Sequence, residues 1–292
     1  MTDLKITDVR AHKGDNAFLI DDGKTAVLFD TGFGFNGFKI AENIKEQLGD
    51  RPLDYILLSH SHYDHALASA YLLEFWPDTT VVAGEYAAKI FAKPSAREIM
   101  RGLDKKFAEK CGVTDYPDLI DNLRIDKVVS DGDVIRAGDM QFVAMNFPGH
   151  TKCSVGFYMP EKKLLLGSET LGIYAGEDSV FPSYLVGYKM TMNSIQRISE
   201  LDIDALLIPH HGMVYGQKAR DFITKNQITA RETAEQLIEL IKEGKSDPEL
   251  MDFYISKFIN DTIDDFYPED ARNLNTSITV KLFRQIVAGE KE

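Results

Sequence analysis

Residues 54–65 read DYILLSHSHYDH, an apolar run that ends abruptly in four side chains able to bind metal ions. A short, continuous apolar run is typical of a strand buried on both faces of a sheet. In an extended segment His60 and His62 point to the same side, and as the chain turns into a helix Asp64 and His65 can face the same point. The stretch therefore predicts a ligand cluster just past the end of a buried strand.

The donor types in this cluster narrow the choice of metal. Imidazole and carboxylate together suit zinc, iron or manganese, whereas calcium and magnesium prefer shells of oxygen alone. A solvated polar turn is the alternative, but four such groups within six residues would then concentrate charge and desolvation cost without any return. We therefore expect a transition-metal site.

Other polar positions also follow apolar strands. His150 lies at the end of the predicted strand that leads into NFPGH (146–150). Glu169 lies at the end of KLLLGSE (163–169), and His210 and His211 lie at the end of ALLIPHHG (205–212). Strand ends along one edge of a sheet are adjacent in space, and α/β proteins place their sites there. One histidine at such a place is more often an ordinary loop residue, but the agreement of several strand ends favours ligands.

Strands and helices alternate up to about residue 215. Residues 16–32 predict a hairpin, because Asp22 and Gly23 accept the positive φ angles of a tight turn. Residues 85–124 are charged and predict a mostly helical excursion from the sheet, after which short strands return.

The last part of the chain has a different pattern. Beyond Gly216 apolar residues recur with the period of an amphipathic helix, and Asp247 with Pro248 predicts the start of a further helix. We expect one domain at 1–215 and a helical extension packed on it at 216–292.

Composition excludes several classes of protein. The 292 residues are 44% apolar and 27% charged, which is typical of a globular chain, and the net charge of -13 disfavours nucleic acid and anionic lipid as partners. The opening residues lack the apolar region of a signal peptide, and no apolar run approaches the roughly 18 residues of a membrane span. Only Cys111 and Cys153 are present, so we expect a cytoplasmic protein without a disulfide framework.

The motifs resemble those of the metallo-β-lactamase superfamily from about residue 16 to residue 212. HSHYDH is the most specific motif, and FDTG with Asp30, PGHT (148–151), LLLGSET (164–170) and PHHG (209–212) accompany it in the order typical of the family. The resemblance implies an α/β fold, a four-layer αββα sandwich with a two-metal site at its sheet edge, in a cytoplasmic branch with a helical C-terminal extension.

The resemblance also implies roles for individual residues. Asp30 would lie near the metal ions without binding them, although a carboxylate capping a turn is the alternative. Glu169 would bridge two divalent ions, with zinc preferred to iron or manganese. The ligands of the first ion would be His60, His62 and His150, and those of the second Asp64, His65 and His211.

Three positions depart from the family pattern. Glu169 stands where Asp is usual, which leaves open whether it bridges both ions. His210 stands where Gly is frequent, so it is a candidate substrate contact or general acid, with an exposed loop histidine as the alternative. Cys153 replaces another frequent Gly, and we expect it to be a small buried side chain rather than a reactive thiol.

Hydrolysis is the chemistry that the resemblance implies. A metal-bound hydroxide would attack a small ester, thioester, lactone or phosphodiester, with Asp64 aligning the water and His210 supplying a proton. Phe181, Tyr184 and Tyr188 are candidate substrate contacts, with helix packing as the alternative. Their segment is loosely similar to the branch that contains the bacterial quinolone-signalling thioesterase, and no substrate follows from this.

Two other functions stay open at this point. One is a non-heme di-iron redox protein related to the flavodiiron oxygen and nitric oxide reductases, without their flavodoxin domain. The other is a binding or regulatory protein with little turnover. A nuclease is disfavoured because no stripe of Lys and Arg is present, and apolar helix faces in the extension indicate a pocket cover or a homodimer surface.

Overall fold

The computed structural model describes residues 4–176, 179–264 and 266–290, and the chain divides into two compact units. The first unit is Met1–Asn146 with Val155–Glu161, and the second is Phe147–Ser154 with Lys162–Glu292. The domain boundary expected at residue 215 stays a prediction. In the described part of the chain, no helix combines the length and the apolar character needed to cross a membrane.

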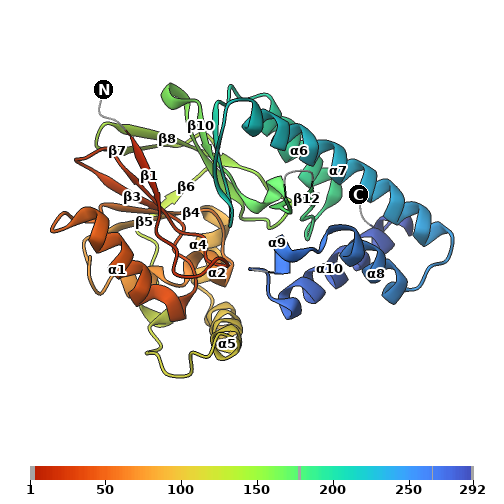
Figure 1. Cartoon of the computed structure of the whole chain (residues 1–292), viewed down its shortest axis with the longest axis horizontal. Helices are drawn as coiled ribbons and strands as arrows, with labels where there is room; N and C mark the ends of the chain where they lie inside the picture. The colour runs from red at the N-terminus through yellow and green to blue at the C-terminus, as the bar shows by residue number, and fades with distance from the viewer. Residues whose placement is uncertain (1–3, 177–178, 265, 291–292) are drawn as a thin grey trace. The chain divides into compact units, whose positions relative to one another are not determined.

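A mixed six-stranded sheet forms the centre of the first unit (Figure 1). The predicted hairpin is confirmed, because the second and third strands pair antiparallel around Asp22 and Gly23. The next three strands add in parallel, with Phe29 opposite Leu57, so the third and fourth strands end at the same edge. In order, the strands are β1 (Lys5–Asp8), β2 (Phe18–Asp21), β3 (Ala26–Phe29), β4 (Tyr55–Leu58), β5 (Thr80–Gly84) and β6 (Lys127–Val129).

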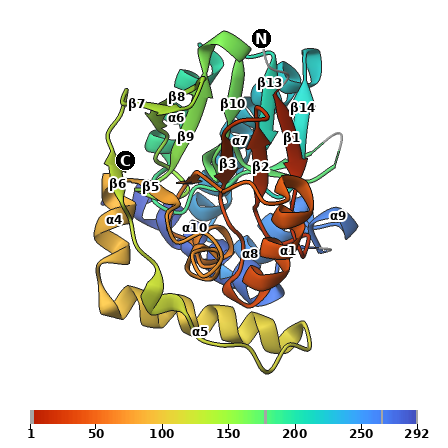
Figure 2. The same ribbon diagram turned by 90° about the vertical axis from the view of Figure 1, so that its left-hand side faces the viewer.

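The first unit also contains an antiparallel group of three strands and several helices. Phe157 of this group packs edge-on against Phe29 of β3, with ring centroids 6.1 Å apart, and both rings are fully buried. Figure 2 shows the helical excursion predicted at 85–124, which is helical as far as Lys110. The strands are β7 (Val134–Ala137), β8 (Met140–Asn146) and β9 (Val155–Met159), and the helices are α1 (Gly37–Leu48), α2 (Tyr63–Ala66), α3 (Ser69–Leu72), α4 (Glu85–Phe91) and α5 (Pro94–Lys110).

The strands of the second unit also bring polar residues to one edge. The parallel strands β10 (Leu164–Leu166) and β13 (Ala205–Ile208) pair with Leu166 opposite Leu207, so the segments that follow them leave the same edge. Strand β14 (Gly212–Tyr215) pairs antiparallel with β13. A separate ribbon is formed by β11 (Ile173–Tyr174) and β12 (Val180–Phe181).

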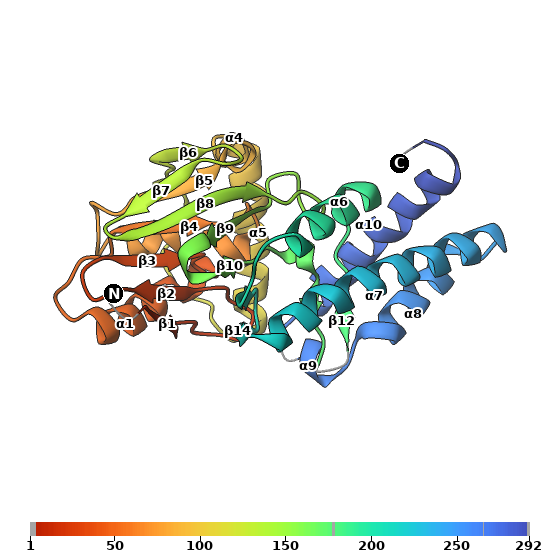
Figure 3. The same ribbon diagram turned by 90° about the horizontal axis from the view of Figure 1, so that it is seen from above.

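The helices of the second unit pack around an apolar core that includes Tyr184, Tyr254 and Phe283. Figure 3 shows the long helix α7 alongside α6, and contacts also join α7 to α8 and α10. The helix expected at Asp247 exists, but Ser246 is its N-cap, because the Ser246 backbone N–H donates to the Glu249 carboxylate in a capping box. The helices are α6 (Tyr188–Ser199), α7 (Gln217–Lys242), α8 (Asp247–Phe258), α9 (Asp261–Asp264) and α10 (Glu269–Val287).

Candidate metal centre

The first donor set lies in the first unit and consists of His60, His62, Asp64 and His65. The set begins two residues after β4 ends, and its last two members lie in the short helix α2. The His60 ring centroid is 4.5 Å from that of His62 and 4.1 Å from that of His65, and His65 Nε2 is 3.7 Å from Asp64 Oδ2. The chain turn expected from the sequence therefore gathers all four side chains.

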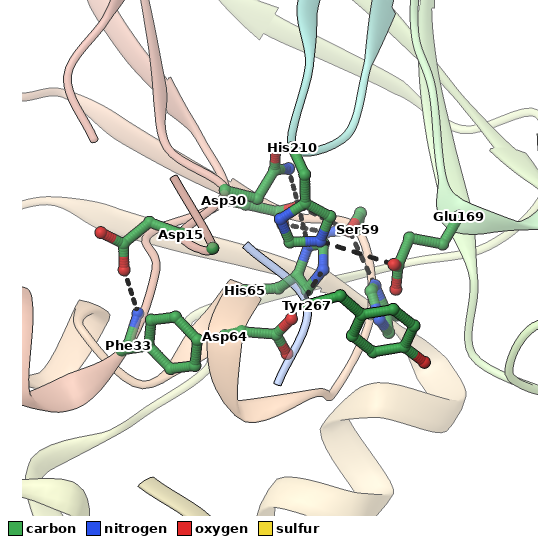
Figure 4. Close-up of polar contacts among 12 residues, drawn as sticks. Asp15, Asp30, Phe33, Ser59, Asp64, His65, Glu169, His210 and Tyr267 are labelled. Atoms are coloured by element: carbon green, nitrogen blue, oxygen red, sulfur yellow. Dashed lines mark hydrogen bonds and ion pairs between the residues drawn. The ribbon is translucent and has the colours of Figure 1, made fainter. Parts of the chain in front are cut away.

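Asp30 fixes the orientation of His65. Asp30 directly follows β3, its side chain is fully buried, and its Oδ2 lies 2.8 Å from His65 Nδ1 (Figure 4). Asn16 Nδ2 donates to the same oxygen at 2.7 Å, and the Ser59 backbone N–H donates to Oδ1 at 2.7 Å. Since a carboxylate accepts hydrogen bonds, His65 Nδ1 carries the proton, which leaves Nε2 with a lone pair for a metal ion.

The Ser59 hydroxyl links Asp30 to His60 and fixes the orientation of the His60 ring in the same way. The Ser59 hydroxyl donates to Asp30 Oδ2 at 2.7 Å, and the Ser59 oxygen lies 2.9 Å from His60 Nδ1. Because that hydroxyl proton is committed to Asp30, the Ser59 oxygen accepts from His60 Nδ1–H, and the lone pair of His60 is again on Nε2. The arrangement agrees with the role near the site that the resemblance implied for Asp30.

The backbone at Asp30 has an uncommon conformation. Its φ is 53°, and His210 has a φ of 60°; left-handed angles are rare for residues other than glycine and cluster at functional sites. Asp30 is the first residue after β3, and His210 is the second residue after β13. In both cases the local turn is what aims the side chain.

Two buried carboxylates that the sequence analysis did not single out hold the segment after Asp30. Asp15 accepts from the Phe33 N–H at 2.9 Å (Figure 4), and Asp104 of α5 accepts from the Gly34 N–H at 2.8 Å. Burial raises the pKa of each carboxyl to about 6, although these hydrogen bonds oppose the shift. Neither residue lies in a recognisable motif, so only the folded chain reveals them.

The second donor set lies in the second unit and consists of His150, Glu169 and His210. His210 Nε2 is 3.4 Å from Glu169 Oε1 (Figure 4). His150 Nε2 is 2.8 Å from Glu169 Oε2. All three residues are buried. The carboxylate of Glu169 therefore lies between two imidazoles, whichever metal ions it contacts.

Neighbouring hydroxyl groups orient this second set. Ser183 Oγ lies 2.6 Å from His150 Nδ1, which leaves the opposite ring nitrogen directed at Glu169. The Thr170 hydroxyl donates to the Phe147 carbonyl at 2.6 Å and accepts from the His150 backbone N–H at 3.3 Å, so it joins the two segments that carry the donors. Ser183 was not predicted from the sequence.

His210, rather than His211, is the histidine that faces Glu169. His210 is only 8% exposed, and its ring stacks on Phe266 at a centroid distance of 5.5 Å. His211 is exposed and stacks on Tyr174 at 3.7 Å. The geometry thus favours His210 as the ligand where the resemblance implied His211, and the exposed loop position considered for His210 belongs to His211.

The three aromatic residues proposed as substrate contacts take part in packing within the second unit. Phe181 stacks on Phe258, and Tyr184 is fully buried with its hydroxyl donating to the Ala230 carbonyl at 3.0 Å. Tyr188 is partly buried against this core. Contact of these rings with a substrate stays a prediction, and Cys153 is the buried side chain that was expected.

The separations between neighbouring donor atoms suit ligands of metal ions. Bonds of about 2.0 to 2.1 Å in a tetrahedral zinc site place neighbouring ligand atoms roughly 3.3 Å apart. The separations of 2.8 and 3.4 Å in the second set and 3.7 Å in the first bracket this value. Imidazole nitrogens held by oxygen acceptors on their far side are typical of metal-binding histidines, so the donors present fit transition-metal ions.

Comparison with known proteins identifies the family of this chain. The profile described as the metallo-beta-lactamase superfamily matches residues 13–210. A metallo-beta-lactamase family protein from Thermus thermophilus aligns with a TM-score of 0.62 and 18% identity, covering 94% of this chain and 89% of its own. The fold is therefore the metallo-β-lactamase fold, two mixed sheets flanked by helices, with additional C-terminal helices, as the sequence motifs implied.

Three curated relatives are 22% to 26% identical to the chain over their aligned residues. Hydroxyacylglutathione hydrolase GloC of Haemophilus influenzae is 22% identical over 220 residues, 74% of this chain and 95% of that protein. An acyl-coenzyme A thioesterase of Homo sapiens is 23% identical over 228 residues, 73% of this chain and 78% of that protein. The probable hydroxyacylglutathione hydrolase of Schizosaccharomyces pombe is 26% identical over 132 residues, and the match spans only 38% of its length.

Proposed function

Because the chain belongs to the metallo-β-lactamase superfamily, we propose that it is a metal-dependent hydrolase of small thioesters or related esters, lactones or phosphodiesters. The observation that supports this most directly is the orientation of the histidines. Asp30 and Ser59 hold the Nδ1 atoms of His65 and His60, and both rings thereby present Nε2 as a donor.

We propose that the donors of the two sets together bind two divalent ions. The residues that would hold them are His60, His62, Asp64 and His65 in the first set and His150, Glu169 and His210 in the second. Bound divalent ions would polarise a carbonyl or phosphoryl oxygen and lower the pKa of water. Asp64 retains partial solvent access, with a side-chain exposure of 22%, which supports assigning it the role of orienting a water molecule.

Thioesters are the substrate class to which we assign first place. Two relatives of which the chain covers 95% and 78% are called a hydroxyacylglutathione hydrolase and an acyl-coenzyme A thioesterase. Both names describe cleavage of a thioester, in which a carbonyl carbon is attacked and a thiolate leaves. Asp64 would align the attacking water, and a proton donor such as solvent would neutralise the departing thiolate.

The test is a hydrolysis panel on purified protein of measured metal content. S-lactoylglutathione, a short and a long acyl-coenzyme A, a lactone, a carboxylic ester and a phosphodiester cover the classes. The His62→Ala variant should lose at least about 10²-fold in kcat/KM on any substrate that the wild type cleaves, since it removes a donor of the first set. No turnover of any member by fully loaded protein would reject the hydrolase assignment.

The metal content and visible spectrum of the same purified protein distinguish a hydrolase from the alternative di-iron redox protein. Iron with a visible absorption band in air, together with an absence of hydrolysis, would favour a di-iron protein, whereas colourless protein with zinc and thioesterase activity supports the proposal. Ligand binding without any turnover would instead favour the regulatory alternative.

A further inference from the structure

A cavity of about 260 Å³ lies in the first unit beside the long helix α5, which Figure 2 shows in full. At roughly 30 Å³ per water molecule, this volume accommodates about nine waters or a ligand with a similar number of non-hydrogen atoms. Among the described residues that line the cavity, none belongs to the first donor set. The residues that line the cavity are therefore distinct from the donors to which we assign metal binding.

Two tyrosine rings and several aliphatic side chains form part of the wall. Tyr71 and Tyr116 line the cavity together with Leu67, Val113 and Ile120. The hydroxyl groups of both tyrosines are already used, since Tyr71 donates to the Pro117 carbonyl and Tyr116 donates to Asp104. Fixed hydroxyls hold both rings in place. Tyr71 is buried and only 3% exposed, whereas Tyr116 is half-buried and offers the larger part of the aromatic surface.

The carboxylate of Asp104 is the charged group most deeply placed in this wall. It is 3% exposed and accepts hydrogen bonds from the Gly34 N–H at 2.8 Å, the Phe35 N–H at 3.2 Å and the Tyr116 hydroxyl at 2.8 Å. All three donors are neutral, and three bonds leave room for about one more on two carboxylate oxygens. Within the described residues no Lys or Arg forms an ion pair with Asp104, and burial raises its pKa to about 6.

The other charged side chains of the wall balance one another. Arg101 forms ion pairs with Asp118, Glu98 and Asp121, so its positive charge is committed to surface carboxylates. Lys105 and Glu109 are exposed, lie one helical turn apart and carry opposite charges. The buried charge of Asp104 is consequently the one that a ligand would have to complement.

We propose that this cavity binds a small organic ammonium ion, whose positive charge lies near Asp104 and whose carbon groups contact the ring of Tyr116. Aromatic faces attract cations through their quadrupole, and a neighbouring carboxylate adds to this attraction. An anion of the same size would meet a buried like charge, and a neutral molecule would leave that charge without a counterion.

Calorimetric titration of the full-length protein with matched probes tests the charge requirement. Choline is compared with its neutral carbon isostere 3,3-dimethyl-1-butanol, and isoamylamine is compared with isoamyl alcohol. At least one ammonium probe should bind about tenfold or more tightly than its neutral partner, as expected for a desolvated cation against aromatic and carboxylate groups. Absence of binding by both ammonium probes, or equal affinity for charged and neutral partners, overturns the proposal.

Two pairs of variants then locate the binding. Tyr116→Leu should lower ammonium affinity at least about fivefold, whereas Tyr116→Phe keeps the ring and should change it by no more than about twofold. Asp104→Asn should lower affinity about tenfold or more, while Asp115→Asn removes the same charge from a residue that does not line the cavity and should have no effect.

A structural readout keeps the outcome decisive if Asp104→Asn does not fold. In methyl-labelled wild-type protein, the probe should shift the NMR signals of Val113 and Ile120 in the cavity wall and leave those of Val280 in the core of the second unit unchanged. Equal ammonium affinities of Tyr116→Leu and Tyr116→Phe would contradict binding in this cavity. So would NMR shifts that occur only outside the cavity wall. These readouts do not depend on metal loading or hydrolysis.

Discussion

The buried carboxylate of Asp30 fixes the orientation of the His65 and His60 rings in the first donor set. It contacts His65 directly and His60 through the Ser59 hydroxyl, and the Asn16 side chain donates to the same carboxylate oxygen. These contacts set which ring nitrogen carries the proton, so the carboxylate controls metal binding without being a ligand.

Replacing Asp30 by Asn should weaken metal binding by about 10- to 100-fold. The amide nitrogen cannot accept a hydrogen bond from His65 Nδ1–H, so the ring loses its fixed tautomer and orientation. Zinc affinity is measured by competition with a chromophoric chelator, a readout that does not require activity.

Asp54→Asn is the matched control for this experiment. Asp54 also accepts a backbone N–H, that of Ala26 at 2.8 Å, but it precedes β4 rather than following it. The zinc affinity of the Asp54→Asn variant should equal that of the wild type. Ser59→Ala should weaken zinc binding by a smaller factor than Asp30→Asn, and unchanged affinity in both site variants would remove Asp30 and Ser59 from the account.

The carboxyls of Asp15 and Asp104 predict a dependence of stability on pH. Burial raises the pKa of each from 3.8 to about 6, so the folded chain binds more protons than the unfolded chain between these values. Their contribution to the free energy of unfolding is complete below about pH 3.8, falls as the pH rises, and is lost above about pH 6.

The difference in unfolding free energy between wild type and Asp104→Asn isolates one of these groups. The wild type should lose on the order of 2 to 3 kcal/mol relative to the variant between pH 4 and pH 7. Urea denaturation at several pH values measures this difference, and carbon-13 NMR of the carboxyl should give a midpoint near 6. A pH-independent difference would show that Asp104 titrates alike in both states.

Individual donor residues can be predicted from the sequence where they lie close together in the chain. HSHYDH requires only a strand end and one helical turn to gather its four side chains, so its residues could be predicted. The choice between His210 and His211 depends on a left-handed backbone angle of 60° at His210, which a pair of identical neighbours does not reveal. Ser183 and Asp104 come from distant segments and carry no motif.

At the scale of secondary structure, the site depends on parallel strand pairs. Strands β3 and β4 end together and deliver Asp30 and His60, while β10 and β13 do the same for Glu169 and His210. Continuous apolar runs predicted these buried strands and the 16–32 hairpin. The short edge strand β1 and the β11–β12 ribbon were missed, because strands of two to four residues are too short to show a distinct period.

The C-terminal helix α10 offers a test of packing in the second unit. Phe283 is fully buried, and its ring meets Tyr184 edge-on with centroids 5.3 Å apart. Phe283→Ala should lower the free energy of unfolding by about 3 to 5 kcal/mol, because it removes buried apolar surface and leaves a cavity.

Leu274→Ala on the same helix is the matched control. Leu274 is 52% exposed, so its truncation should change the free energy of unfolding by no more than about 0.5 kcal/mol. Chemical denaturation of both variants measures the contrast. Similar losses for the two positions would mean that α10 does not present the Phe283 face to the core.

For the whole molecule, the order of motifs along the chain carried more information than composition. Five short motifs in family order were sufficient to predict the fold, since each marks the end of a particular strand. Composition predicted only a globular acidic chain. The cavity beside α5 could not be foreseen, because Asp104, Tyr71 and Tyr116 face one another only after the helical excursion has folded.

The number of metal ions bound per chain is the decisive measurement for the proposed two-ion site. Purified protein, stripped with a chelator and then reloaded with zinc, is dialysed and analysed by inductively coupled plasma mass spectrometry. We predict two ions per wild-type chain, and a clear loss of bound metal in both His60→Ala and Glu169→Gln. Wild-type protein that retains no zinc, iron or manganese would contradict the account.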